Sequence, residues 1–341
     1  MKTVVNIFKT GLLAAGLFLL SGSFVSCEKA GGAEGDYETV PLVFDSPSIV
    51  YTKESKASVD GSNFPPSASA YPLGIWIVKG DTFEEQISTF RNMKADLSVG
   101  AENEIHWNYY VYNGTKQYDV IYVMKGRKAD VYGYHPWSSS VNDITAVPFT
   151  SGQSDWMWAT PIKLSASETN TDDPIERKLA FSHAMTCLEI NIHTKYQGTV
   201  RLTSLTLNDL AEQPRLIPSG TMNAVTGELT RNAPTSSITI NPNSSLTHQS
   251  TGTLFYIIMP AIGDDENPLD LASKKMQLSF KFNNIDGATT FTLPNTMAGS
   301  ELKAFKRGYK YKYKLVLDNQ MDFVPVGVEK DWGTTYVDFE L

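Results

Sequence analysis

Apolar and polar residues alternate with a period of two along most of the chain, and long helical periodicity is absent. Because successive side chains of a strand point to opposite faces, this alternation predicts strands with one buried face. The clearest example is residues 309–317, where tyrosine and leucine alternate with lysine and valine. Many short strands joined by Gly, Pro, Asn and Asp turns predict an all-β fold built of β-sandwiches.

Two turn signals add hairpins to this pattern, at Asn113-Gly114 and at residues 284–287. Asn-Gly favours the two-residue turns that join antiparallel strands. The expected arms are residues 107–112 with 115–123, and residues 277–282 with 289–293. A single short helix is expected at residues 83–90, with Asp81 or Thr82 as its N-cap.

Residues 179–192 form one apolar stretch whose alternation changes phase near Cys187. The apolar positions are odd-numbered before this residue and even-numbered after it. Such a change predicts either two strands or one strand with a β-bulge. Cys187 itself is expected to be a small buried core residue.

A polar stretch at residues 165–176 is the best position for a domain boundary. It predicts an N-terminal β-sandwich domain at residues 37–175 and a C-terminal one at residues 176–341. Each part is long enough to bury a core of its own.

The first 27 residues have the three parts of a secretory signal. Lys2 and Lys9 supply the positive charge, and an apolar run at residues 11–20 follows, too short to span a bilayer. Small residues then lead to Cys27, at the position where a bacterial lipoprotein signal places the lipidated cysteine. We expect a signal peptide at residues 1–26 and a flexible tether at residues 27–36. The chain is therefore expected to be exported and lipid-anchored, the alternative being a plain signal peptide with an incidental cysteine.

Charge and cysteine content exclude several classes of protein. The formal net charge is −8, so nucleic acid is not expected as a partner, because its binding needs clustered positive charge. Two cysteines are too few for a disulfide-stapled scaffold or a cysteine-based zinc site.

The chain contains none of the common catalytic, nucleotide-binding or calcium-binding motifs, so no catalytic residue, metal ligand or cofactor is predicted. Its five histidines lack the spacing of a metal site. Ser182 and His183 are neighbours on an expected strand and point to opposite faces, so His183 is interpreted as a structural residue. Asp264, Asp265, Glu266 and Asp270 offer oxygen ligands for calcium, but a solvated loop is preferred.

Two further patterns have a binding interpretation and a structural one. Trp156 and Trp158 fit a platform for sugar rings, although buried core positions are preferred. Lys310, Lys312 and Lys314 are interpreted as a solvent-facing strand surface or as protection of a sheet edge, rather than as a binding surface.

Several segments together resemble the fimbrillin family, the lipoprotein-derived (type V) pilins of Gram-negative bacteria. They include the Phe-x-His-x-Met strand and the Gly-Tyr-x-Tyr-x-Tyr strand that precedes a terminal tryptophan. The segments are the N-terminus through Cys27 and residues 72–77, 131–136, 179–188, 308–313 and 326–332. They look closest to the minor-fimbrillin-like branch.

The resemblance implies two tandem transthyretin-like sandwiches and a mechanism of assembly. In pilin members, a trypsin-like protease removes the first strand of the lipidated precursor, and a C-terminal strand of the next subunit fills the groove. The candidate first strand here carries Val40, Leu42 and Phe44 on one face. Lys53 and Lys56, the basic residues that follow this strand, are the candidate cut sites. Family members often have arginine at the cut, whereas no arginine precedes Arg91 here.

The candidate donor strand is the last segment, residues 332–341, where Val337, Phe339 and Leu341 alternate with polar residues. Burying these three side chains is worth about 5–8 kcal/mol before ordering costs. The same strand would equally suit insertion into its own domain.

We therefore predict a cell-surface pilin or adhesin that does no chemistry. Its expected partners are other pilin subunits, the outer membrane through a lipid on Cys27, a processing protease, and host or bacterial surface ligands. The alternatives are a glycan-binding surface lipoprotein that does not polymerise and, more remotely, a secreted hydrolase without a recognisable motif.

Overall fold

The structure is a computed structural model. It describes residues 39–42, 48–49, 72–79, 90–99, 105–110, 116–118, 121–124, 128–165, 179–248, 252–264, 266–273, 275–283, 287–297, 300–317 and 323–330. Regular structure in these residues is almost entirely strand, apart from a 3-10 helix, η4 (Ile144–Ala146), so the predicted all-β fold is confirmed. None of the described helical structure has the length and hydropathy that a membrane-spanning helix requires.

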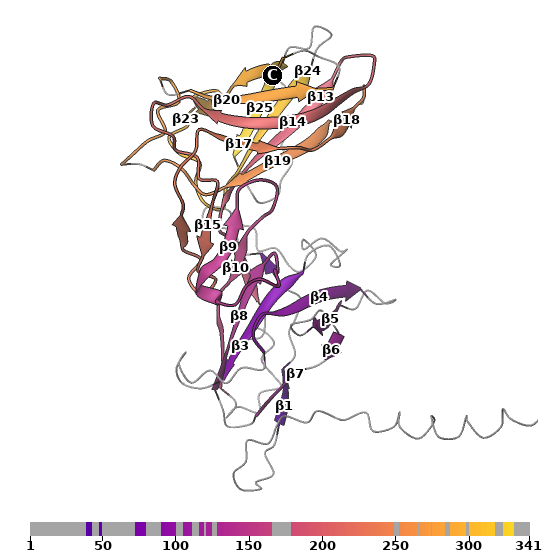
Figure 1. The fold of residues 1–341 in the computed structure, drawn as a ribbon, viewed down its shortest axis with the longest axis vertical. Helices are drawn as coiled ribbons and strands as arrows, with labels where there is room; N and C mark the ends of the chain where they lie inside the picture. The colour runs from indigo at the N-terminus through magenta and orange to yellow at the C-terminus, as the bar shows by residue number, and fades with distance from the viewer. Residues whose placement is uncertain are drawn as a thin grey trace, which may run out of the picture. The chain divides into compact units, whose positions relative to one another are not determined.

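The first half of the chain supplies eight strands of a nine-stranded sheet, and the second half supplies the ninth, β12; several of these strands are labelled in Figure 1. Its order is β2 (Ser48–Ile49), β12 (Ala180–His183), β10 (Met157–Ala159), β8 (Lys128–His135), β3 (Leu73–Lys79), β4 (Met93–Val99), β5 (Ile105–Tyr110) and β6 (Lys116–Tyr118). The ninth strand, β11 (Ile162–Ser165), also pairs with β8. Its strands pair antiparallel, except that β2 lies parallel to β12.

Both faces of strand β3 are buried, which explains its nearly continuous apolar sequence. Leu73, Ile75 and Ile77 belong to one hydrophobic cluster, together with residues of β4, β8, β10 and β12. Trp76 and Val78 belong to a second cluster, which also takes side chains from β9 (Val147–Thr150), β13 (Thr186–Thr194) and β15 (Ser219–Met222).

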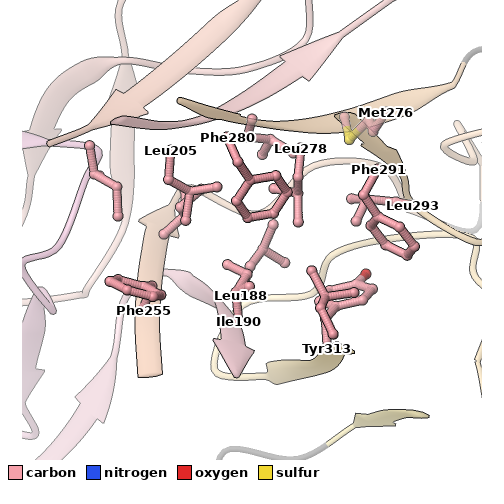
Figure 2. Close-up of a cluster of buried hydrophobic side chains, with 14 of the residues drawn as sticks. Leu188, Ile190, Leu205, Phe255, Met276, Leu278, Phe280, Phe291, Leu293 and Tyr313 are labelled. Atoms are coloured by element: carbon pink, nitrogen blue, oxygen red, sulfur yellow. The ribbon is translucent and has the colours of Figure 1, made fainter. Parts of the chain in front are cut away.

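The second half contains a β-sandwich with two sheets. One has the order β19 (Thr253–Met259), β13, β24 (Lys310–Leu317) and β25 (Phe323–Lys330). The other has the order β17 (Ser237–Ile240), β14 (Val200–Asp209), β20 (Met276–Phe282) and β21 (Thr289–Thr292), with β18 (Ser244–Leu246) also on β14. Figure 2 shows side chains from the two sheets, such as Leu188 and Phe280, meeting in one core.

Three small sheets complete the described fold. β16 (Leu229–Arg231), β15 and β9 form one, β22 (Thr296–Met297) and β23 (Ser300–Glu301) form another, and β1 (Thr39–Leu42) pairs with β7 (Ile121–Met124). The β15–β9 pair joins residues from either side of the predicted domain boundary. The division at residue 175 stays a prediction, and β12, which follows it, pairs with β10 of the first half.

One of the two predicted hairpins is confirmed in full and the other in part. β20 and β21 pair as expected across residues 284–287. β5 pairs with β6, but the expected second arm does not continue, because residues 121–124 form β7 and pair with β1 instead. The short helix expected at residues 83–90 lies almost wholly outside the described residues.

The stretch at residues 179–192 contains two strands, which was one of the two predicted alternatives. β12 and β13 are separated by a bend at Ala184 and Met185. They belong to different sheets, since β12 pairs with β10 whereas β13 pairs with β19 and β24. The change of phase therefore marks the point where the chain leaves one sheet and enters another.

Candidate assembly site

The strand that the sequence predicts to be removable is present as β1. It pairs antiparallel with β7, and the register places Val40 opposite Val123 and Leu42 opposite Ile121. Within the described residues β7 is the only strand that pairs with β1. Phe44, the third residue of the predicted apolar face, lies outside the described residues. The role of this strand as a removable plug stays a prediction.

A second pairing follows in the same N-terminal segment and was missed by the sequence reasoning. β2 lies parallel to β12, with Ser48 opposite Ala180 and Ile49 opposite Phe181. It forms an edge of the nine-stranded sheet. A two-residue strand without a regular alternation gives little signal in a sequence, so only the structure reveals it. The segment that precedes Lys53 thus pairs with two different strands.

At the other end of the described chain, β25 forms an edge of the four-stranded sheet. It pairs antiparallel with β24, and its register slips between Lys314 and Leu315, so Val326 has no opposite residue. β25 ends at Lys330, and the candidate donor segment begins two positions later, at residue 332.

The remaining predicted assembly residues lie outside the described residues. These are the lipidation site Cys27, the cut sites Lys53 and Lys56, and the donor residues Val337, Phe339 and Leu341. Their roles stay predictions.

A buried polar cluster lies where β8, β10 and β12 come together. His135 and His183 both lie opposite Met157, so all three side chains share one face of the sheet. Nδ1 of His183 lies 2.8 Å from an Oδ2 of Asp155, and Nδ1 of His135 lies 3.2 Å from the carbonyl oxygen of Pro72. Burial lowers the pKa of His135 against the opposing effect of the Asp155 carboxylate.

The interpretation of His183 as a structural residue is confirmed, because only 5% of it is exposed. Asp155, its acidic partner, was missed by the sequence reasoning. It comes from the irregular segment before β10, which is distant in sequence from β12. Among the described residues, no group of three His, Cys, Asp or Glu side chains is arranged to hold a metal ion.

The two tryptophans do not form an open sugar-binding platform. Trp156 is 8% exposed, and its indole N–H donates to the carbonyl oxygen of Thr150, 3.2 Å away. Trp158 is half-buried, with the guanidinium of Arg307 5.8 Å from its ring centroid. The preferred interpretation of Trp156 as a core residue is therefore confirmed.

The lysines of β24 lie on the solvent side of their strand, as expected. Tyr311 and Tyr313 on the opposite side are buried, whereas Lys310, Lys312 and Lys314 are half-buried or exposed. The alternative of an edge strand is wrong, because β24 lies between β13 and β25.

The acidic loop has a local structural role. An Oδ1 of Asp264 accepts hydrogen bonds from the backbone N–H groups of Glu266 and Asn267. The carboxylate of Asp270 accepts hydrogen bonds from the backbone N–H and from the hydroxyl group of Ser273. Asp265 lies outside the described residues. These bonds stabilise the turns of the loop and agree with the preferred interpretation of a solvated loop.

Cys187 is buried, as predicted, and its burial raises the pKa of the thiol.

Comparison with solved structures finds bacterial proteins described as cell adhesion or fimbrial proteins. A proposed cell adhesion protein from Bacteroides fragilis has a TM-score of 0.50 at 10% identity and covers 87% of this chain and 96% of its own. A second, from Bacteroides uniformis, has a TM-score of 0.48 at 19% identity, covering 77% and 91%. The tip fimbrial protein Mfa3 of Porphyromonas gingivalis has a TM-score of 0.32 at 12% identity, covering 77% and 94%.

No curated protein matches the sequence of this chain. A family model does match it, and its description is "Fimbrillin-like". The match runs over residues 68–332, which is well over half of the chain and includes strands of both halves. It covers the segments on which the sequence resemblance depended, apart from the N-terminus. The chain therefore belongs to the fimbrillin-like family.

Proposed function

We propose that the chain is a structural subunit of cell-surface fimbriae, exported as a lipoprotein precursor anchored to the outer membrane through Cys27. Its role is adhesion and assembly rather than catalysis. Proteolysis at Lys53 or Lys56 removes the N-terminal segment, and residues 332–341 of another subunit replace it. Family membership and the pairing of β1 with β7 support this proposal.

The pairing of β1 is the observation that carries the mechanism. It spans four residue pairs with one partner strand in the described structure. A net contribution of about 0.5–1.5 kcal/mol for each backbone hydrogen bond makes so short a ladder replaceable once the chain is cut. A longer strand from another subunit can then displace β1 from the edge of β7, because it forms more backbone hydrogen bonds and buries more apolar side chains there.

The N-terminal segment ends its described pairing at Ile49, before both candidate cut sites. A cut at Lys53 or Lys56 would therefore leave β1 and β2 together on the released fragment. Both partners, β7 and β12, would then present unpaired backbone groups to an incoming strand.

Limited proteolysis of a secreted form without Cys27 tests this function. We expect mild trypsin treatment to cut after Lys53 or Lys56, as identified by intact mass and N-terminal sequencing. The cut protein should give a ladder of oligomers on a denaturing gel loaded without boiling. A cut without a ladder would indicate a tip or anchor subunit.

Two variants and one control sharpen the experiment. A double change, Lys53→Ala with Lys56→Ala, should prevent the cut, whereas Lys195→Ala in the exposed turn between β13 and β14 should leave it unchanged. Deletion of residues 336–341 should abolish the ladder and leave a folded monomer. Oligomers that survive this deletion would refute assembly through the C-terminal strand.

A further inference from the structure

Each described strand that contains a proline lies at the edge of its sheet. These strands are β1 with Pro41, β9 with Pro148 and β25 with Pro325. An edge strand presents unpaired N–H and C=O groups to any strand that approaches, and proline removes one of the donors. The distribution therefore indicates that the fold restricts strand addition at specific edges.

The register of β1 shows which side Pro41 affects. Pro41 lies opposite Tyr122, inside a ladder that continues on both sides. Since its nitrogen has no hydrogen, Pro41 belongs at a non-hydrogen-bonded pair of the antiparallel ladder. Its nitrogen then faces away from β7, toward the outer edge of β1. An incoming strand at that edge would find no donor at the centre of β1.

The last described strand is restricted in a similar way. Pro325 lies next to the irregularity that leaves Val326 without an opposite residue. A bulge twists a strand locally and disrupts the regular spacing that another strand would need. Both ends of the described chain therefore carry an edge strand that is poorly suited to pairing.

We propose that Pro41 is an edge block that prevents the uncut chain from accepting a strand of a second copy on the outer edge of β1. The strand that it excludes is the donor strand of the second copy, residues 332–341, so the inference rests on the proposed function. That segment contains no proline, and it alternates apolar and polar residues over residues 336–341. β7 contains none either, so release of β1 would remove the block and open an unblocked edge in one step.

Pro41→Thr in the uncut full-length chain, held in detergent, tests this block. Threonine favours strands and restores the missing donor. A labelled peptide of residues 331–341 should bind this variant about tenfold more tightly than it binds the wild type, because one backbone hydrogen bond is gained and an obstruction is lost. Fluorescence anisotropy measures the binding, and size-exclusion chromatography with light scattering should show self-association of the variant alone.

Pro234→Thr is the matched control, because Pro234 lies in an exposed loop outside the strands. It should behave as the wild type in both assays, and a thermal melt checks that each variant is folded. A monomeric Pro41→Thr variant that binds the peptide no more tightly than the wild type would overturn the edge block. An equal gain in the Pro234→Thr variant would overturn it as well.

The two proposals fail in different measurements. Cut wild-type protein that does not bind the peptide would count against donor-strand assembly. The edge block is instead read from the self-association of the uncut Pro41→Thr variant, which requires no proteolysis.

Discussion

Replacement of Arg215 by alanine should strongly destabilise the fold, because it leaves a buried carboxylate without its counter-ion. Asp209 ends β14 and is 3% exposed. Its Oδ1 and Oδ2 accept hydrogen bonds from Nη2 and Nε of Arg215, at 2.6 and 2.9 Å. The same guanidinium donates through Nη1 to the carbonyl oxygen of Leu269, so it joins β14 to a second loop.

The expected loss of stability follows from the hydrogen bonds that Asp209 would keep in the Arg215→Ala variant. Asp209 would keep two backbone donors, the N–H groups of Ala211 and of residue 215. Breaking a buried ion pair from one side typically costs about 3–5 kcal/mol. The Arg215 side chain is 22% exposed, so water reaches part of the site, and we expect the lower end, about 3 kcal/mol. That is a large fraction of the stability of a typical domain.

Urea unfolding monitored by tryptophan fluorescence measures this loss as a shift of the midpoint at constant slope. Arg201→Ala is the control, since Arg201 is exposed and its Nε donates to one carbonyl oxygen. We expect that change to cost less than about 1 kcal/mol. An equally small effect of Arg215→Ala would refute the reasoning, because the ion pair would then make no net contribution.

Three further changes test other parts of the structure. Burial lowers the pKa of His135; Asp155 and the Pro72 carbonyl oppose this shift, and His183 adds to it. The His135 imidazole therefore binds a proton more readily in the unfolded chain than in the folded one. Stability should therefore fall as pH drops through the unfolded-state value of about 6.5, and His135→Gln should flatten this part of a urea-midpoint profile. In Gly74→Ala the new methyl group would overlap the Tyr134 ring, and thermal unfolding should show that the protein loses about 1–3 kcal/mol of stability. Tyr313→Phe should be neutral or stabilising in the same melt, because this buried hydroxyl has no hydrogen-bond partner among the described residues. A pH profile unchanged in His135→Gln, a neutral Gly74→Ala, or a Tyr313→Phe loss above about 1 kcal/mol would each contradict the corresponding argument.

Local alternation predicted the strands well wherever one face of a strand is buried. Residues 310–317 are the clearest case, since Tyr311 and Tyr313 are buried in the core of the sandwich, where Figure 2 shows Tyr313, whereas the lysines are half-buried or exposed. The change of phase near Cys187 likewise corresponds to the passage from β12 to β13. These features depend on neighbours in the sequence, and a pattern of residues can therefore encode them.

Pairing between distant segments could not be predicted in the same way. The contacts of β1 with β7 and of β2 with β12 join residues that lie far apart in the sequence. Asp155 meets His183 because β10 and β12 are neighbours in the sheet, and nothing near either residue in the sequence indicates this. Such contacts depend on the register of whole strands, which tertiary packing decides.

The short connection between β12 and β13 has a mechanical consequence for any force that pulls on the chain. Ala184 and Met185 alone separate the two strands, and both are fully buried. Two extended residues span at most about 7 Å, so the connection has almost no slack to take up. Tension applied to β12 would pass directly into β13, which is held on both sides by β19 and β24. A pulling force would thus meet resistance from two ladders at once before the chain could lengthen at this point.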